Sequence, residues 1–359
     1  MEVSTRPYPS VEIKIDRILE NARTVQGICR EHGIRLSVVT KVLSDNLEVV
    51  SHLVDAGIDC ICEARIDNLI SYRELDVEKW LIRIPMLSEV KDVVRFADAS
   101  LNSEMETVRA LNREAAHQHR VHNVILMYEL GDLREGMMRD ELMASVREFS
   151  VLKNVHLYGL GVNLSCYGQV LPSERNMAEF RQVVRDVEEE IGRPLEIVSG
   201  GNSTSMEMLV AGTLPPAINN LRMGEAIFFG NLPCKDRPID FLNRDNFVLR
   251  TQIIELKEKP SMPWGNQGDV NALGVSTQFV DRGIRKRALV ALGRQDVNLY
   301  DIQPLDKQIN VLGCSSDHTI LDVTDSERDY KLGDIVEFRL DYAGLLALMT
   351  TKHVSRKIV

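Results

Sequence analysis

The chain has 359 residues, of which 44% are hydrophobic and 27% charged, and its formal net charge at pH 7 is -10. This composition is typical of a globular protein and excludes a chain disordered throughout, while the acidic balance argues against a basic nucleic-acid-binding surface. No apolar run approaches the ~18 residues that span a bilayer, and the N-terminus lacks a basic-then-apolar signal pattern, so we expect a cytoplasmic protein.

The cysteines are spread along the chain, and no two of them form a Cys-x-x-Cys pair. They are Cys29, Cys60, Cys62, Cys166, Cys234 and Cys314. In a cytoplasmic chain of this length we expect reduced core residues rather than a disulfide framework. Cys60 and Cys62 could share one face of a strand, but no His or second Cys pair joins them to supply four zinc ligands. No metal site is therefore predicted.

A short strand at 11–15 precedes a series of apolar segments that alternate with helical patterns. The predicted barrel strands are 36–42, 58–64, 79–85, 99–103, 121–130, 156–165, 195–201 and 220–230. Apolar residues at helical spacing predict helices between them. Eight such units, over a span near the ~250 residues typical of the fold, predict a (β/α)8 barrel, assigned to residues 11–235. The rival, an open doubly wound sheet, needs a G-x-G-x-x-G first turn, and that turn is absent.

The sequence pattern changes near residue 231. Irregular sequence with two prolines gives way to short β-branched runs, such as TQIIELKEK, HTILDVT and GDIVEFRL, bounded by Gly, Asp and Ser. These runs predict a second, all-β domain over residues 240–359. The early strand within residues 1–15 is free to join this domain, because the strands of the barrel are already accounted for.

Lys41 lies near the end of the first predicted barrel strand, and barrel enzymes carry their function at that end. A lysine within an apolar strand is costly unless it is paired or neutralised, and lysine is the residue type that forms Schiff bases with carbonyl compounds. The structural alternative is a strand-end lysine that reaches solvent.

The string SGGNSTS at 199–205 follows the seventh strand and opens a helix. Its glycines allow close backbone approach, and Ser203 with the helix N-terminal amides could bind a phosphate, as barrels often do after strands seven and eight. A tight turn capped by Asn or Ser explains the same string without a ligand.

Three more polar residues follow other strands. Arg222 on the last strand suits an anionic or planar partner, or a structural pair with Glu225. Arg134, after the fifth strand, could clamp a carboxylate or simply reach solvent. Asn163, after the sixth, is a candidate polar group of the barrel mouth or a turn former. Taken together with Lys41 and the 199–205 loop, these residues indicate a pyridoxal phosphate site.

The strings GDLREG, GVNLSCYG, VSGGNSTS, NLRMGEA and CSSDHTILDVTDS, with the spacing between them, resemble the alanine racemase family. The likeness covers nearly the whole chain and is strongest to the ornithine racemase branch. It implies pyridoxal phosphate bound in a barrel that is followed by a β-domain. It also implies an amino-acid racemase acting on ornithine or another basic amino acid, assembled as a homodimer with shared active sites.

The resemblance carries a role to each matching position. Lys41 looks like the cofactor lysine, and Arg222 like the arginine that faces the pyridine nitrogen. Arg134 resembles an arginine near the phenolic oxygen and the substrate carboxylate, and Asn163 stands where many members have a histidine beneath the ring. The expected phosphate contacts are Asn202, Ser203, Gly224 and Glu225. Ser316 and Asp317 match β-domain residues that close the site from the partner subunit.

This chain departs from the family pattern at two positions. The fourth residue after the lysine is Asp45, where a tyrosine is usual, and the family's second base, a tyrosine, is replaced by Arg294. Arginine is a poor base, so either Lys41 works alone or another group serves the opposite face. The candidates for that group are His318, Cys166 and Tyr167. Tyr342 or His353 would replace the family's C-terminal phosphate tyrosine.

Two alternative functions stay open from the sequence. A decarboxylase of the same fold acting on basic amino acids normally uses a nucleophilic cysteine in the β-domain, and Cys314 could fill that role. A non-catalytic pyridoxal phosphate carrier would resemble barrel-only proteins, against which the long β-domain argues.

Overall fold

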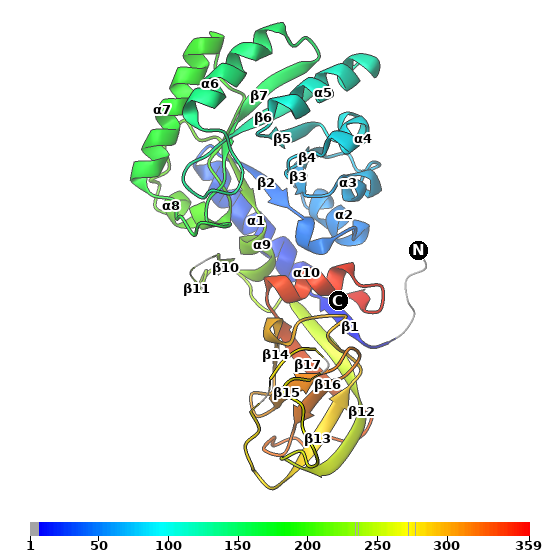
Figure 1. Ribbon diagram of the computed structural model, residues 1–359. Coiled ribbons are helices and arrows are strands. Elements are labelled where there is room, and N and C mark those ends of the chain that lie inside the picture. The colour runs from blue at the N-terminus through cyan, green and yellow to red at the C-terminus, as the bar shows by residue number, and fades with distance from the viewer. Residues whose placement is uncertain (1–6, 234, 236, 272, 277) are drawn as a thin grey trace. The chain divides into compact units, whose positions relative to one another are not determined.

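The computed structural model describes residues 7–233, 235, 237–271, 273–276 and 278–359 (Figure 1). Cys234 and the start of the predicted strand region at 1–15 therefore lie outside the described residues. The chain divides into two compact units. One is Asp16–Arg244, and the other combines the segment up to Ile15 with Asp245–Val359.

The first unit is a closed barrel of parallel strands, which confirms the predicted (β/α)8 class. Its strands are β2 (Arg35–Val39), β3 (Cys60–Glu63), β4 (Glu78–Leu81), β5 (Ala99–Asn102), β6 (His122–Tyr128), β7 (Val155–Val162), β8 (Ile197–Ser199) and β9 (Asn220–Met223). Neighbouring strands pair in sequence order, and β9 closes the ring on β2, with Arg35 opposite Asn220.

Helices connect the strands and lie outside the ring in Figure 1. They are α1 (Ile15–Glu31), α2 (Leu47–Asp55), α3 (Ile66–Ser71), α4 (Val90–Phe96), α5 (Met105–His117), α6 (Arg139–Glu148), α7 (Glu174–Ile191), α8 (Met206–Val210) and α9 (Glu225–Phe229). Short 3-10 turns precede or follow several of them: η1 (Lys41–Leu43), η2 (Leu87–Glu89), η3 (Phe149–Val151) and η4 (Ser203–Ser205). A two-stranded ribbon, β10 (Asn231–Leu232) with β11 (Arg237–Pro238), follows.

A tight apolar cluster packs several of the barrel strands together. Residues two apart on a strand contribute together, as Cys60 with Cys62 and Leu101 with Ala99, because alternate side chains point to one face. Trp80 joins this cluster and is fully buried. The barrel is thus a filled core rather than a pore, and polar side chains that act on a ligand must sit at its ends.

The second unit is built on an antiparallel sheet. Its strands are β1 (Ser10–Ile13), β12 (Phe247–Pro260), β13 (Ile284–Val290), β14 (Ile302–Pro304), β15 (Asn310–Cys314), β16 (Thr319–Asp322), β17 (Ile335–Leu340) and β18 (Ser355–Ile358). The order along the sheet is β14-β17-β12-β13-β16-β15, and β1 pairs with β12 and, in parallel, with β18. The 3-10 turn η5 (Leu299–Asp301) and the helix α10 (Tyr342–Thr350) accompany it. The antiparallel sheet confirms the predicted C-terminal β-domain, to which the structure adds the helix α10 that the sequence analysis did not predict.

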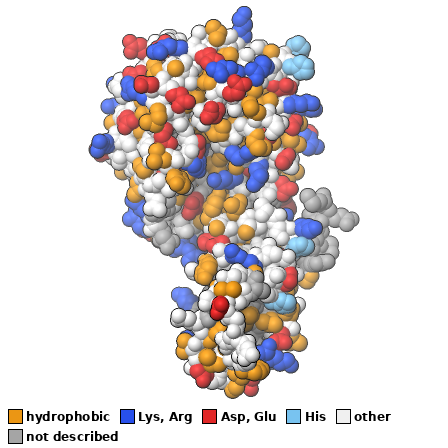
Figure 2. Space-filling model, viewed as in Figure 1, with side chains coloured by type: hydrophobic (Ala, Val, Ile, Leu, Met, Phe, Trp, Pro, Cys, Tyr) orange, Lys and Arg blue, Asp and Glu red, His pale blue; other side chains and the backbone are white. Residues whose placement is uncertain are grey.

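Acidic and basic side chains are interspersed over the face of the barrel unit seen in Figure 2. This mixing suits the modest negative net charge of -10. Among the described residues, no helix is long and apolar enough to cross a membrane.

Candidate active site at the barrel rim

The parallel topology places the carboxyl ends of all eight strands at one rim. Lys41 follows β2, Arg134 follows β6, and Asn163 follows β7 directly. Asn202 and Ser203 follow β8, while Arg222 lies on β9 just before Gly224 and Glu225. The barrel residues singled out from the sequence are therefore brought together at the end of the barrel where such enzymes carry their function. Ser316, Asp317 and His318 belong to the other unit and are described with it below.

The sequence pattern placed Lys41 within the first barrel strand. That prediction was wrong, because β2 ends at Val39. Thr40 adopts helical backbone angles, and Lys41 opens the 3-10 turn η1. The turn ends at Ser44, whose φ of 54° is unusual for a residue other than glycine. The Tyr72 hydroxyl donates a hydrogen bond to the Ser44 carbonyl over 2.5 Å. The lysine is thus presented on a short, tightly held turn.

A carboxylate that the sequence analysis missed lies behind this turn. Glu63, the last residue of β3, is fully buried. It accepts hydrogen bonds from the Thr40 hydroxyl at 3.0 Å, the Asn68 amide at 3.1 Å and the Ala64 N–H at 3.0 Å. Burial raises the pKa of Glu63 to about 7, against the opposing effect of these hydrogen bonds.

Arg222 is buried on β9 with only 4% of its surface exposed. Its guanidinium donates to the Ser199 hydroxyl and, over 2.9 Å, to the Val162 carbonyl. Burial lowers the pKa of Arg222, although it stays a cation at neutral pH. Among the described residues its hydrogen-bond partners are neutral, so this buried charge suits an anionic or electron-rich ligand group.

The loops after β8 and β9 form one cradle. The Ser203 hydroxyl accepts hydrogen bonds from the N–H groups of Gly224 (3.3 Å) and Ala226 (3.1 Å), which open α9. Asn202 caps η4 and donates to the Leu164 carbonyl at 2.8 Å. A side chain at Gly224 would place its Cβ 2.8 Å from the Val39 carbonyl oxygen. Backbone N–H groups therefore gather here at closely packed helix starts, an arrangement that suits a phosphate.

Asn163 links this cradle to the loop after β6. Its Nδ2 donates to Glu135 at 2.9 Å, and its Oδ1 accepts from Asn202 at 3.4 Å. Glu135 also forms an ion pair with Arg134. Although partial burial opposes its charge, this ion pair raises the pKa of Arg134. The three residues place one cation and one anion side by side at the rim.

Asp132 was also missed from the sequence. It is 1% exposed and accepts hydrogen bonds from the N–H groups of Cys166, Tyr167 and Gly168, each at 3.0 Å. It thereby ties the loop after β6 to the loop after β7. The Cys166 thiol contacts Asn163 and Asn202 at 3.6 Å, while Tyr167 is 72% exposed. Burial raises the pKa of Cys166, and the nearby charges of Arg134 and Lys41 oppose that shift.

In the second unit, Ser316, Asp317 and His318 lie in the exposed turn between β15 and β16. Gly293 packs directly against it, since a Cβ there would lie 2.1 Å from the Ser316 carbonyl oxygen. Gln295 donates to both the Ser316 carbonyl, through its N–H, and the Asp317 carboxylate. The His318 N–H donates to the Ser315 hydroxyl at 3.2 Å, and the His318 ring Nδ1 lies 3.4 Å from the same hydroxyl, so the contacts of this side chain stay within its own turn.

Other predicted candidates are also in this unit. Arg294 and Cys314 line one cavity of about 460 Å³. Burial raises the pKa of Cys314, and Arg294 opposes the shift. Tyr342 begins α10, and His353 is exposed in the loop that follows it. The described cysteines are free thiols, and no three metal-binding side chains gather within the described part of the chain.

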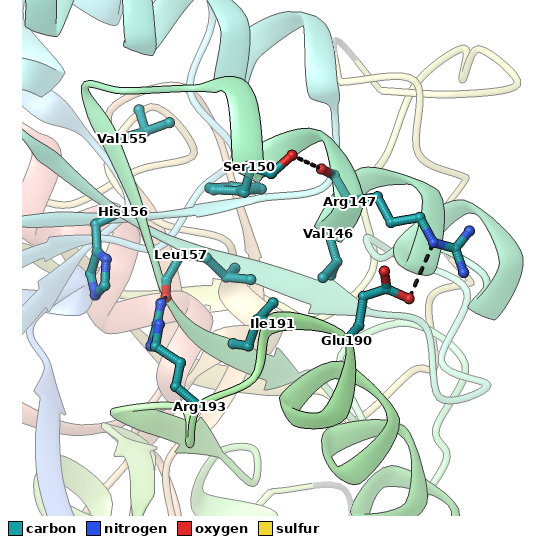
Figure 3. A pocket seen from close by; sticks show the side chains of 10 residues that line it. Val146, Arg147, Ser150, Val155, His156, Leu157, Glu190, Ile191 and Arg193 are labelled. Carbon is teal, nitrogen blue, oxygen red and sulfur yellow. Dashed lines mark hydrogen bonds and ion pairs between the residues drawn. The ribbon is translucent and has the colours of Figure 1, made fainter.

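A cavity of about 410 Å³ in the barrel unit is drawn in Figure 3, and it lies at the start of β7, the end of the barrel opposite the strand ends that precede Lys41. It is lined by the start of β7, with Val155, His156 and Leu157, and by the ends of α6 and α7. Figure 3 shows Arg147 paired with Glu190 at its edge, over 3.1 Å. This cavity is therefore separate from the rim that carries the lysine.

The closed parallel barrel is followed in the chain by a β-unit, and its rim carries Lys41 and the buried Arg222. Residues 13–232 match the family model for the N-terminal domain of alanine racemase. The chain belongs to the alanine racemase family, as the resemblance of its motifs predicted.

Two curated relatives are similar in sequence to this chain over nearly its full length. Ornithine racemase of Acetoanaerobium sticklandii is 41% identical over 353 residues, 98% of this chain and 100% of that protein. Lysine racemase of Thermotoga maritima is 37% identical over 351 residues, 97% of this chain and 98% of that protein. The solved structure of alanine racemase from Bartonella henselae with covalently bound pyridoxal phosphate has a TM-score of 0.74 at 16% identity, covering 98% of this chain and 99% of that one. At that identity the last comparison establishes the fold.

Proposed function

We propose that this protein is a pyridoxal phosphate-dependent racemase that interconverts the L and D forms of ornithine or another basic amino acid. The observation that carries the proposal is its end-to-end similarity to two racemases, one named for ornithine and one for lysine. The rim of the barrel, with Lys41 among cationic and anion-binding groups, supports the same conclusion.

The residues at the rim fit pyridoxal phosphate. The N–H groups of Gly224 and Ala226 converge on Ser203 at the openings of two helices, which suits a phosphate. The buried guanidinium of Arg222 has neutral partners and a donor's chemistry, which suits a ring nitrogen with a lone pair. Lys41 supplies the amine that an aldehyde requires.

When bound, pyridoxal phosphate withdraws electrons from the α-carbon of an amino acid and so acidifies its C–H bond. Lys41 Nζ would remove or return the α-proton on one face. Arg134 would hold the substrate carboxylate, releasing Glu135 as it does so. Arg222, always protonated, donates a hydrogen bond without giving up its proton, which favours simple return of the proton to the α-carbon over side reactions.

A proton carrier for the other face completes the mechanism. Cys166 and Tyr167 stand on the same rim as Lys41, and the Cys166 thiol contacts two of the proposed cofactor residues. His318 remains the third candidate, but its contacts within its own turn point to a structural role.

We propose a homodimer in which Ser316 and Asp317 of each subunit complete the site of the other. Their turn is exposed and braced from behind by Gly293 and Gln295, as a surface that meets a partner should be. Mixing Lys41→Ala subunits with Asp317→Ala subunits should restore activity at about one site in four. Mixtures as inactive as either variant alone would contradict sharing. The free thiols described above fit the cytoplasm, the compartment that we propose.

The deciding experiment is α-proton exchange in heavy water, followed by NMR with added pyridoxal phosphate. Both enantiomers of ornithine, lysine, alanine and serine would be tested. Exchange with growth of the mirror-image form of ornithine or lysine is expected. Release of carbon dioxide would instead show the decarboxylase, and a bound cofactor without exchange on any substrate would show a carrier.

A further inference from the structure

The turn that carries Lys41 is held from behind by four buried polar residues. Thr40, Glu63 and Tyr72 are fully buried, and Asn68 is 8% exposed. Thr40 donates to the Cys62 carbonyl through its N–H at 2.9 Å, so the start of the turn is tied to the end of β3. Glu63 bonds to the Thr40 hydroxyl on one side and to Asn68 on the other.

The far end of the same turn is strained and clamped. Ser44 has its φ at 54°, and the Tyr72 hydroxyl holds its carbonyl. Burial and the charge of Glu63 raise the pKa of Tyr72, so this hydroxyl stays a donor. Strained residues persist only where their surroundings over-determine them, and they concentrate at functional sites. The backbone on either side of Lys41 is therefore set by one buried network.

The two oxygens of Glu63 are not equivalent. Oε2 accepts from the Ala64 N–H and the Asn68 amide, and the Arg65 backbone N–H also contributes a hydrogen bond to the carboxylate. Oε1 accepts from the Thr40 hydroxyl, which also lies 3.3 Å from the Cys62 carbonyl. A proton on Oε1 would donate to the Thr40 oxygen, and the Thr40 hydroxyl would then turn to Cys62. The network thus has two complete hydrogen-bond arrangements that differ by one proton taken from water.

We propose that Glu63 is a positioning residue for Lys41. The charge state of Glu63 acts through the Thr40 hydroxyl, and it sets how the turn that carries Lys41 is held and how readily Lys41 reacts. The inference rests on the proposed role of Lys41 but concerns a different residue. Since burial brings the pKa of Glu63 to about 7, both arrangements are populated near neutral pH.

Titratable groups also lie on the elements packed around Glu63, and the variants used in the test leave them unchanged. Besides Tyr72 of the network itself, they are Lys41 and Asp45 from the segment after β2, Arg65 and Asp67 from the α3 segment, and Arg83 with its partner Glu89 after β4. Arg83 is committed to Glu89 and to the Ala64 carbonyl, whereas the hydrogen bonds of Glu63 go to neutral groups.

The test uses Glu63→Gln, which reproduces the protonated arrangement at every pH. Its amide oxygen accepts from Ala64 and Asn68, and its NH2 donates to Thr40. The full-length apoprotein is exposed to a limiting amount of an amine-acylating reagent between pH 5.5 and 8.5, and modification of Lys41 is measured by peptide mass spectrometry. We expect the variant-to-wild-type rate ratio to stay near 1 below pH 6 and to depart from it about threefold or more above pH 8. The ratio of kcat/KM for ornithine should follow the same curve.

The matched control is Glu78→Gln at the start of β4, an acid at the other end of the barrel that pairs with Arg35. Its ratio should be constant with pH. Thr40→Val removes the relay, and adding Glu63→Gln to it should change nothing further. This variant also carries the test if Glu63→Gln fails to fold, because it alone should flatten the pH dependence.

A flat ratio for folded Glu63→Gln would overturn the proposal, as would an undiminished pH-dependent effect of Glu63→Gln in the Thr40→Val background. Because acylation of Lys41 needs no substrate, it tests Glu63 even if no amino acid is racemised. Failure of the racemase proposal is therefore distinguishable from failure of this one.

Discussion

The two ends of the barrel differ in how their charged side chains are buried and paired. At the rim, Glu63 and Arg222 are buried and bonded to neutral groups. At the other end, charges are partly exposed and paired: Arg35 with Asp59 and Glu78, and Glu196 with Arg193 and His156.

This difference suggests that the charged residues of the rim serve the function of the protein and that those of the other end serve its stability. Burying a charge without an opposite charge costs free energy, so such groups persist where a ligand or a reaction needs them. Exposed ion pairs contribute about 0–1 kcal/mol each and impose little on the ligand site. Substitutions at the rim should therefore change activity most, and those at the other end should change stability alone.

The largest effect is expected from Lys41→Ala. Loss of the group that we propose moves the α-proton should lower kcat/KM for ornithine by roughly 10³-fold or more, because general base catalysis alone contributes about 10²–10⁴. The melting temperature should change little. Lys91→Ala, which removes an exposed lysine of α4, is the control. A Lys41→Ala protein that racemises at the wild-type rate would end the proposed mechanism.

Arg222→Gln should rank second. The buried guanidinium would be lost together with its hydrogen bonds to Ser199 and Val162. We expect kcat/KM to fall by about 10²-fold, the usual consequence of removing one preorganised donor. Equilibrium dialysis should show weaker cofactor retention. Arg193→Gln, at the other end, should leave both quantities unchanged, and an equal loss there would show that the two ends are not independent.

The sequence predicted the barrel because its strands are continuous apolar runs, separated by helices of clear periodicity. It also predicted which rim residues would meet, since parallel strands bring their carboxyl ends together. Lys41, Arg134, Asn163, Ser203 and Arg222 follow from topology alone. Their roles stay proposals, because topology says which side chains are neighbours and not what they bind.

Glu63 and Asp132 could not be found in this way. Glu63 stands in the apolar run DCICEA, and its partner Thr40 is 23 residues away. Asp132 resembles a loop residue until the loop after β7 folds onto it, more than thirty residues on. Burial of a polar group depends on segments distant in the chain, which local periodicity does not report. The helix α10 was missed among strand-like runs for a related reason: its apolar residues surround the helix rather than forming one stripe.

The two ends should also respond to pH in opposite directions. Burial lowers the pKa of His122, at the start of β6, to about 4, where its ring lies 2.8 Å from the Ser100 hydroxyl. The unfolded chain then binds a proton that the folded chain refuses, so stability falls as pH drops from about 6.5 toward 4. For Glu63, with its pKa raised to about 7, the folded chain holds the extra proton, so stability falls as pH rises from about 4.5 to 7.

We expect these opposite effects to offset each other in the wild type, and single variants to expose them. Between pH 5 and 7, Glu63→Gln should gain stability with rising pH and His122→Gln should lose it, each by on the order of 2 kcal/mol. Urea unfolding reports this through the fluorescence of buried Trp80, in a Trp264→Phe background that removes an 82% exposed tryptophan of the other unit. Parallel pH profiles for the two variants would contradict the assignment.

The smallest effect is expected at the cavity drawn in Figure 3. Arg147→Ala removes a side chain that is 60% exposed and forms an exposed ion pair with Glu190, so the loss of stability should stay below about 1 kcal/mol. Arg193→Ala should cost more, because Arg193 also donates to the Leu157 carbonyl at 2.7 Å, on a barrel strand. Neither change should alter kcat/KM by more than about twofold, since both residues lie at the end of the barrel opposite the strand ends that precede Lys41. A larger change in kcat/KM from Arg147→Ala than from Arg193→Ala would mean that this cavity, rather than the packing of β7, communicates with the rim.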